Sequence, residues 1–186
     1  SGANAFLAGM KTRGVAALFT IPTIGWVAKA PPKYNHPFDC GCPASVNPNQ
    51  TDFDPYDPQC GNGLNPDGSY SQCAPPETTS VQTSPEWART WVEYIVQKHG
   101  PANGQRIYAL DNEPALWRHT HRDIRTQPLG YDELWQRMRD YAVAILEADP
   151  TAEIAGPAEW GWPNYFCSDA DETSQGCSAS SPDRRS

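Results

Sequence analysis

The sequence lacks any long apolar run. No stretch of its 186 residues approaches the roughly 18 apolar residues that a transmembrane helix needs, so we expect no membrane span. It also lacks an initiator Met and a charged segment followed by an apolar secretory run. We therefore expect residue 1 to be an interior position, with any export signal removed or outside this piece.

Positive charge is also scarce. Lys and Arg number 14 against 22 Asp and Glu, which gives a formal net charge of -8. Nucleic acids and anionic membrane surfaces favour basic patches, so we expect neither as a partner. Aromatic residues, in contrast, are abundant, with 7 Trp, 8 Tyr and 5 Phe. Flat apolar faces beside hydroxyls and carboxylates suit sugars, so some of these aromatics are expected to face a groove.

The cysteines lack the paired Cys-x-x-Cys spacing that is typical of zinc knuckles. Their even number and their position in turn-rich segments favour disulfides and an oxidising compartment. We expect Cys60 to pair with Cys73 and Cys167 with Cys177. A zinc site built from the first four cysteines is the less favoured alternative. The six cysteines are Cys40, Cys42, Cys60, Cys73, Cys167 and Cys177.

An ordered calcium loop is missing as well. Acidic and amide residues recur between residues 47 and 57 without the ligand spacing of an EF-hand, so ordinary Asx turns are the preferred interpretation. We expect no required cofactor and no metal site, with structural calcium as an alternative that the spacing does not support. The residues concerned are Asn47, Asn49, Asp52, Asp54 and Asp57.

The apolar periodicity predicts alternating helices and strands. Capping residues, Gly and Pro set the expected ends of each element. Trp87 and Trp91, at helical spacing, are expected to be core residues. The order predicts an α/β fold with parallel strands in a single domain, 1–186. The expected elements are a helix at 3–13, a strand at 15–21 that is buried on both faces, an irregular Cys-, Pro- and Asp-rich loop at 30–83, a helix at 85–99, strands at 107–110 and 152–156, a helix at 131–148 and a disordered tail at 168–186.

The strand at 107–110 stops at Asp111-Asn112-Glu113-Pro114. The carboxyl ends of parallel strands meet at one edge of a sheet, where active sites of α/β proteins lie. There Glu113 can exchange a proton with a reacting oxygen, while the neutral Asn112 can hold a hydroxyl. A strand followed by a capped turn is the alternative. The side chains expected to converge are those of Trp26, Asn112, Glu113, Glu159 and Trp160.

Several separated blocks together resemble glycoside hydrolase family 44, over residues 3 to 167. Members of this family are secreted bacterial β-glucanases and xyloglucanases with a (β/α)8 barrel. Such a barrel needs about 250 residues, so the resemblance implies an internal fragment that covers approximately strands three to five. The blocks are residues 18–22, 24–27, 108–114, 116–117, 120–123, 131–134, 156–157 and 160–162.

The resemblance also implies roles for individual residues. Glu113 corresponds to the general acid/base at the end of strand four, and Asn112 to the residue that binds the substrate 2-hydroxyl. Trp26 and Trp160 become candidate sugar platforms. The nucleophile of the family is a second Glu at the end of strand seven, which we expect beyond residue 186. Glu159 is a less favoured substitute, because strand five neighbours strand four.

The expected function is therefore retaining hydrolysis of β-1,4-glucosidic bonds in cellulose-type glucan or xyloglucan by the complete, secreted and monomeric enzyme. The partner would be a β-glucan polysaccharide or oligosaccharide, and this chain would supply the acid/base half of the active site. His119 and His121 belong to one of the resembling blocks and are interpreted as loop scaffolding around Glu113. The alternatives are a non-catalytic carbohydrate-binding module, or an inactive fragment that does not fold alone.

Overall fold

The chain is divided into two compact units that interleave along the sequence. The structure, a computed structural model, describes residues 2–29, 40–175 and 177. The first unit comprises Ser1–Gly25, Thr83–Ala115 and Leu129–Ser186, and the second comprises Trp26–Gln82 and Leu116–Pro128. Two segments of the second unit thus interrupt the first.

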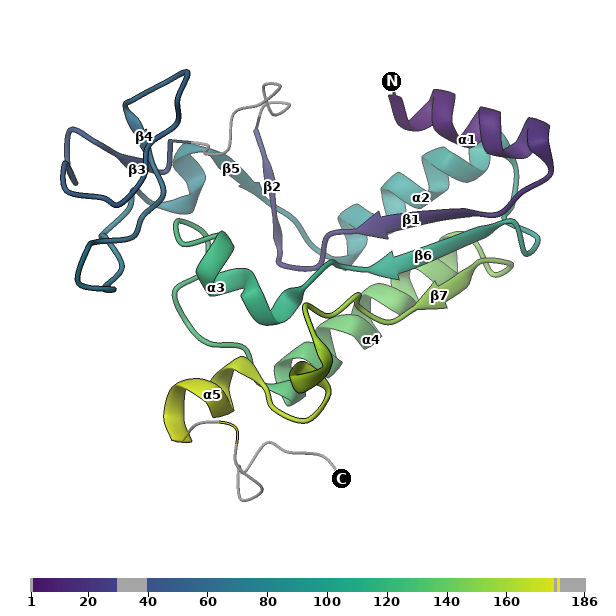
Figure 1. The fold of residues 1–186 in the computed structure, drawn as a ribbon. Coiled ribbons are helices and arrows are strands. Elements are labelled where there is room, and N and C mark those ends of the chain that lie inside the picture. Colours follow the sequence, from purple (N-terminus) through teal and green to yellow (C-terminus); the bar gives the residue numbers. More distant parts are fainter. Residues whose placement is uncertain (1, 30–39, 176, 178–186) are drawn as a thin grey trace. The chain divides into compact units, whose positions relative to one another are not determined.

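The strands of the first unit form a parallel sheet with the order β1-β6-β7 (Figure 1). These strands are β1 (Ala17–Ile21), β6 (Arg106–Leu110) and β7 (Glu153–Ala155). Their carboxyl ends lie at the same edge because all three run in one direction. The predicted α/β class with parallel strands is therefore confirmed, whereas the sheet of the described residues is open and forms no closed barrel.

Three helices of the first unit follow the sequence pattern closely: α1 (Gly2–Arg13), α2 (Pro85–His99) and α4 (Tyr131–Ala148). The hydroxyl of Ser84 caps α2 by accepting a hydrogen bond from the N–H of Trp87 at 3.4 Å, and Gly100 ends it with φ of 82°. Among the residues that the structure describes, no helix is both long and apolar enough to cross a membrane.

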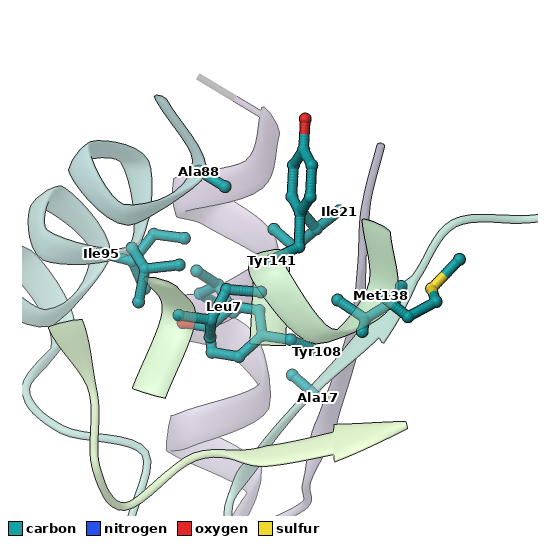
Figure 2. Close-up of a cluster of buried hydrophobic side chains, with 11 residues drawn as sticks. Leu7, Ala17, Ile21, Ala88, Ile95, Tyr108, Met138 and Tyr141 are labelled. Carbon is teal, nitrogen blue, oxygen red and sulfur yellow. The ribbon is translucent and has the colours of Figure 1, made fainter. Parts of the chain in front are cut away.

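The hydrophobic core lies between this sheet and its helices (Figure 2). Trp87 and Trp91 pack against the core, as predicted, and the ring of Trp91 meets that of Phe19 edge to face at 5.2 Å. Every residue of the core cluster belongs to the first unit. The cluster contains Leu7, Ala17, Ile21, Ala88, Val92, Ile95, Tyr108, Leu110, Met138, Tyr141 and Ile145.

One prediction about β1 is wrong. The continuous apolar run predicted a strand buried on both faces, but Leu18 is 57% exposed while Ala17 and Ile21 are buried. Successive side chains of a strand point to opposite faces, so core packing on one face leaves Leu18 on the other. An apolar run alone does not say how many faces of the strand are covered.

The described residues of the second unit form short elements. Here β2 (Trp26–Ala28) pairs antiparallel with β5 (Ser80–Gln82), and β3 (Cys42–Pro43) pairs antiparallel with β4 (Cys60–Gly61). A 3-10 helix, η1 (Pro76–Thr78), and the short helix α3 (Trp117–Thr120) complete it. The segment predicted as an irregular loop, 30–83, thus includes short strands, and its residues 30–39 lie outside the described part of the chain.

Two disulfides hold the second unit together. They join Cys40 to Cys60 and Cys42 to Cys73. The predicted pair of Cys60 with Cys73 is therefore wrong. The reason is the register of β3 and β4, which places Cys42 opposite Gly61 and which no spacing in the sequence reveals.

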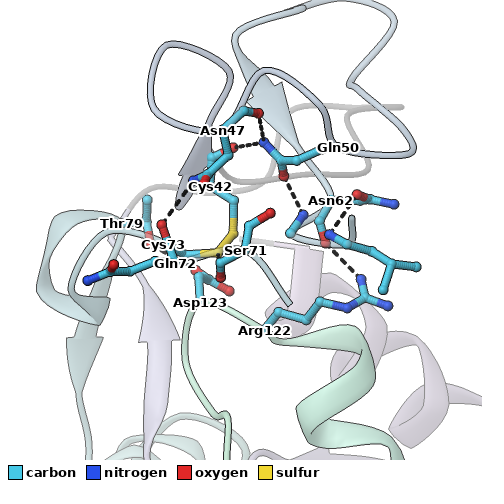
Figure 3. Close-up of a disulfide and its surroundings, with 12 residues drawn as sticks. Cys42, Asn47, Gln50, Asn62, Ser71, Gln72, Cys73, Thr79, Arg122 and Asp123 are labelled. Atoms are coloured by element: carbon cyan, nitrogen blue, oxygen red, sulfur yellow. Dashed lines mark hydrogen bonds between the residues drawn. A yellow bond between two sulfur atoms is a disulfide. The ribbon is translucent and has the colours of Figure 1, made fainter. Parts of the chain in front are cut away.

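The buried side-chain amide of Gln50 forms hydrogen bonds to three backbone groups of the second unit (Figure 3). The Gln50 side chain donates to the carbonyl oxygens of Cys42 and Asn47, both at 2.9 Å, and accepts from the N–H of Gly63 at 2.5 Å. Gly63 has φ of 73°, and a Cβ atom there would lie 2.9 Å from the Cys42 sulfur. Glycine is therefore required at this position for its conformation and for space.

The C-terminal segment is more ordered than its composition predicts. A helix, α5 (Asp169–Gln175), occupies part of the range that we expected to be a disordered tail. The Ser168 hydroxyl accepts from the N–H of Asp171, whose carboxylate accepts from the N–H of Ser168, which is a reciprocal cap. The predicted disulfide between Cys167 and Cys177 is confirmed. Residues 176 and 178–186 lie outside the described residues.

Candidate functional site

The candidate site follows the carboxyl end of β6. Asp111 and Glu113 both adopt left-handed backbone conformations, with φ of 70° and 52°. Residues other than glycine rarely do so, because their Cβ atoms crowd the backbone. Such conformations persist where surrounding contacts impose them, and they are concentrated at functional sites.

Asp111 is a structural member of this turn. Its N–H donates to the carbonyl oxygen of Ile21 at 2.9 Å. Its Oδ2 accepts from the N–H and the hydroxyl of buried Thr23 at 2.5 and 3.0 Å, and its Oδ1 accepts from the N–H of Asn112 at 2.8 Å. The carboxylate therefore ties the segment after β1 to the segment after β6. The alternative interpretation of this segment, a strand followed by a capped turn, therefore applies to Asp111.

The next two residues extend the sheet toward the segment after β7. Asn112 forms an isolated parallel bridge with Ala158, and the N–H of Glu113 donates to the Ala158 carbonyl oxygen at 2.6 Å. The Asn112 residue is exposed and Glu113 is half-buried. Pro114 then begins a 3-10 helix, η2 (Pro114–Leu116). The structure therefore brings Asn112 and Glu113 to the end of β7, as the strand order predicts.

Glu159 joins this arrangement. Its carboxyl group lies near the backbone N–H groups of Ala115 and Trp160. Its Oε2 is buried without a hydrogen-bond partner among the described residues. Burial raises the pKa of the Glu159 carboxyl, the two N–H donors lower it, and the nearby charges of Asp111 and Glu113 raise it. Ala158, which contacts Asn112 and Glu113, directly precedes Glu159, so the segments that carry the two carboxyl groups lie side by side.

Aromatic side chains follow Glu159 directly. Trp160 is 65% exposed and Trp162 is 73% exposed. In the 3-10 helix η3 (Trp162–Tyr165) and just after it, the Trp162 ring lies 5.8 Å from that of Tyr165 and 5.2 Å from that of Phe166. Of these aromatic residues, only Trp160 was predicted from the sequence to be a site residue. The density of aromatics between residues 160 and 166 would have indicated the others.

Trp26 belongs to the second unit, unlike the other candidate site residues. It is half-buried, begins β2 and pairs with Gln82 in the second unit. The contacts that connect Asn112, Glu113 and Glu159 all lie in the first unit.

The groups considered as metal ligands have other partners. Cys40 and Cys60, which lie with Asp57 in a potential ligand cluster, form a disulfide and so offer no thiolate. Asp54 accepts from the N–H groups of Tyr56 and Asp57 at 2.7 and 3.1 Å, as in an Asx turn.

His119 in α3 contacts a tyrosine. Its Nδ1 lies 2.7 Å from the Tyr70 hydroxyl, and both residues belong to the second unit. The scaffolding role of this loop around Glu113 stays a prediction.

Known proteins resemble the chain over most of its length. The model of glycoside hydrolase family 44 matches residues 1–184. CelM2, a bifunctional glucanase-xylanase from a metagenome library, is 32% identical with a TM-score of 0.83, covering 98% of this chain and 36% of that protein. A Paenibacillus polymyxa xyloglucanase of the same family, solved with xyloglucan, is 24% identical with a TM-score of 0.57 and shares the fold over 94% of this chain and 32% of its own.

A curated relative agrees with this assignment. Endoglucanase A of Paenibacillus lautus is 42% identical over 78 residues, which are 40% of this chain and 11% of that protein. The chain thus spans about a third of the solved relatives and about a tenth of this curated one. The family match extends over nearly all of its residues, so the chain belongs to glycoside hydrolase family 44.

Proposed function

We propose that the complete protein hydrolyses β-1,4-glucosidic bonds in cellulose-type glucan or xyloglucan, with this chain supplying the acid/base half of the active site. The family assignment supports glycan hydrolysis, and the names of the relatives support these substrates. The observation that carries the proposal is the position of Glu113. It lies at the carboxyl end of a central parallel strand, in a left-handed turn that its neighbours impose.

In this proposal Glu113 protonates the glycosidic oxygen as its bond to the anomeric carbon breaks. A second carboxylate, beyond residue 186, attacks that carbon from the other face and forms a covalent glycosyl ester. Glu113, now a carboxylate, then takes a proton from the water that displaces the ester. The two carboxyl groups of a retaining enzyme lie about 5 Å apart. In this proposal Glu159 is not the nucleophile, because it follows strand five, which neighbours strand four, whereas the carboxyl pair of the family comes from strands four and seven.

The remaining site residues bind the sugar. Asn112 would bond the 2-hydroxyl, a contact that strengthens in the oxocarbenium-like transition state. Exposed Trp160 offers a flat face to a glucose ring, and Trp26 is a second candidate platform. The acidic net charge of -8 suits a neutral polysaccharide better than a polyanion.

The proposed fold of the complete enzyme is a (β/α)8 barrel in which β1, β6 and β7 are strands three, four and five. The parallel order of these strands and the similarity to CelM2 support it. We also propose that the enzyme is secreted, as a monomer that requires no cofactor. The disulfides support an oxidising compartment.

The test compares Glu113→Gln with the unchanged complete enzyme on xyloglucan. Loss of the general acid/base should lower kcat by about 10²- to 10⁴-fold. Azide, a nucleophile that needs no general base, should restore turnover of a dinitrophenyl cellobioside, whose leaving group needs no proton, and should yield the β-glycosyl azide. The matched control is Glu153→Gln on exposed Glu153 at the start of β7, which should leave kcat unchanged. An unchanged rate in Glu113→Gln would refute the assignment.

The exposed aromatics favour a second candidate, a non-catalytic sugar-binding module. Trp160 and Trp162 are 65% and 73% exposed, as the platforms of such a module would be. Titration of the folded isolated chain with cello-oligosaccharides distinguishes the candidates. Saturable binding without hydrolysis, by both this chain and the complete protein, would favour the module.

A further inference from the structure

The turn that carries Glu113 begins where the central strand β6 leaves β1. The N–H of Asp111 still donates to the carbonyl oxygen of Ile21, at 2.9 Å, and so continues the pairing of β1 with β6. The N–H of Glu113 instead donates to the carbonyl oxygen of Ala158, after β7, at 2.6 Å. Between these contacts the chain adopts left-handed conformations, with φ of 70° at Asp111 and 52° at Glu113. The turn is therefore held from both neighbouring strands.

Thr23 is a buried polar residue that reaches this turn from the segment after β1. Its exposed fraction is 0%, and it lies 88 residues from Asp111 in the sequence. Its N–H and its hydroxyl both donate to the same oxygen of Asp111, Oδ2, at 2.5 and 3.0 Å. The other oxygen, Oδ1, accepts from the N–H of Asn112 at 2.8 Å. The carboxylate therefore connects Thr23 to the residue just before Glu113.

These hydrogen bonds offset the cost of the left-handed turn. Hydrogen bonds to an ionised carboxylate are stronger than those between neutral groups, and they strengthen further away from water. On the β7 side the contact to Ala158 is made by the backbone, so no change of side chain removes it. On the β1 side the Thr23 hydroxyl is a side-chain donor. Its removal would take a donor from Asp111 Oδ2 and allow the turn to move.

We propose that Thr23 is a positioning residue, whose hydroxyl holds the Asp111 carboxylate and thereby fixes the turn that presents Glu113 to the glycosidic oxygen. This inference rests on the acid/base role proposed for Glu113. Thr23 does not touch the substrate, because it is fully buried and acts through Asp111. What it supplies is an O–H donor at one place, which a serine would also supply and a valine would not.

The experiment compares Thr23→Val with Thr23→Ser in the complete enzyme. Valine keeps the branched shape of threonine without the hydroxyl, whereas serine keeps the hydroxyl without the methyl group. Misplacement of a catalytic group by about 1 Å costs on the order of 10²-fold, so Thr23→Val, which removes one of several contacts, should lower kcat on xyloglucan by about 10-fold with little change in KM. Thr23→Ser should keep kcat within about twofold of the unchanged enzyme. If both variants lose equal activity, packing rather than the hydrogen bond is at stake and the proposal is wrong.

The matched control is Thr90→Val in α2. The Thr90 hydroxyl is exposed and donates to the carbonyl oxygen of Glu86 in the same helix at 3.0 Å. Loss of this hydroxyl should leave kcat unchanged. A fall in kcat equal to that of Thr23→Val would show that the effect is not specific to the turn, and the proposal would be wrong.

A second variant, Asp111→Asn, tests the carboxylate through which Thr23 acts. Asn tolerates the left-handed conformation, so the backbone itself is not penalised. Its amide has one acceptor oxygen, which cannot serve Thr23 and Asn112 from the two observed positions. Asp111→Asn should therefore lower kcat by about 10- to 100-fold, and Thr23→Val added to it should cause little further loss, because the two residues act as one unit. Losses that multiply would show independent action and would overturn the proposal.

Two further readouts separate positioning from general damage. On a dinitrophenyl cellobioside the first chemical step needs no acid, so Thr23→Val should lower kcat/KM less than it does on xyloglucan. Hydrogen exchange at the Glu113 amide should accelerate in Thr23→Val and stay slow in Thr23→Ser, while exchange at Tyr108 in the core stays slow in both. Equal losses on the two substrates, or fast exchange at Tyr108, would mean general damage and would overturn the inference.

The outcomes also separate this inference from the proposed function. If the unchanged complete enzyme hydrolyses no β-glucan, the proposed function fails, while exchange at the Glu113 amide still shows whether Thr23 holds the turn. If Glu113→Gln is inactive but Thr23→Val matches the unchanged enzyme in both kcat and Glu113 exchange, the function stands and the positioning role fails.

Discussion

Three carboxylates at the ends of β6 and β7 have different environments, although the sequence presents all of them as strand-end acids. Asp111 accepts hydrogen bonds from Thr23 and Asn112 and is buried. Glu113 is half-buried and carries its own left-handed backbone. Glu159 is half-buried, and its Oε2 has no hydrogen-bond partner among the described residues. Chemistry at a strand end therefore depends on what surrounds each carboxyl group, not on its presence alone.

The burial of Glu159 predicts a dependence of stability on pH. Burial raises its pKa in the folded chain above the ordinary value of 4.5, so the folded state binds the proton more tightly than the unfolded state does. The stabilisation that this tighter proton binding provides is present at pH values below the pKa of Glu159 in the unfolded chain. It is lost as the pH rises through the pKa of Glu159 in the folded chain. The free energy of unfolding of the unchanged chain, relative to that of Glu159→Gln, should therefore fall as the pH rises above the ordinary pKa of 4.5.

Urea unfolding at several pH values measures this difference. The control is Glu153→Gln, because Glu153 is exposed and should show no such trend. If the free energy of unfolding of the unchanged chain, relative to that of Glu159→Gln, rose with pH, the prediction would be wrong.

At the scale of elements, the helix ends agree best with the sequence, because the residues that end a helix are adjacent to it. Ser84, Pro85 and Gly100 bound α2 where their chemistry predicts. The strand ends are held by contacts that the sequence does not display. Buried Asp149, just after α4, lies 3.8 Å from buried Arg106 at the start of β6.

Asp149→Ala should strongly destabilise this end of the sheet. The Asp149 carboxylate also accepts from the N–H of buried Ala102 at 2.9 Å and from the hydroxyl of Thr151 at 2.7 Å. Its removal leaves a buried guanidinium and a buried N–H without this partner, which costs on the order of 3–5 kcal/mol. Chemical denaturation of the chain measures the loss. Glu147→Ala, on an exposed residue near the end of α4, should change stability by less than about 0.5 kcal/mol. If Asp149→Ala and Glu147→Ala lowered the stability equally, loss of the buried contact between Asp149 and Arg106 would not be the cause.

At the scale of the whole molecule, the two units are stabilised differently. The core cluster lies entirely in the first unit, whereas two disulfides lie in the second. In the short strands β2 to β5 the buried residues are Cys42, Cys60, Gly61 and Ser80, none of which has a large apolar side chain. The disulfide bonds close segments with sequence separations of 20 and 31 residues, and such loops contribute about 3–4 kcal/mol each by restricting the unfolded chain.

Reduction should therefore unfold the second unit selectively. After reduction and alkylation, backbone amides of residues 42–82 should lose protection from hydrogen exchange, because no large core replaces the disulfides. Amides of α2 and α4 should remain protected. A variant with Cys167 and Cys177 both changed to Ser controls for the third disulfide, which lies in the first unit. If residues 42–82 kept their protection after complete alkylation, the prediction would be wrong. Hydrogen bonds such as those of Gln50 would then be sufficient to keep the second unit folded.

Much of the fold could be predicted because its signals are local. Helix periodicity, caps and the abrupt end of the strand before Asp111 all lie within a few residues of the feature they determine. The alternation of elements then implies a parallel sheet with its carboxyl ends together. The exposure of Leu18 and the helix α5 were not predicted, because the first depends on which face of the sheet is covered and the second on a reciprocal Ser168–Asp171 cap in a polar segment.

By itself, the sequence determined the family, the order of the elements and the place of Glu113 at a strand end, since these follow from residues that are neighbours in the chain. The tertiary structure alone decided the pairing of Cys40, Cys42, Cys60 and Cys73 and the structural role of Asp111. These depend on strand register and on hydrogen bonds between segments 88 residues apart. No local pattern specifies such partners, because they are set by how the strands align when the core is packed.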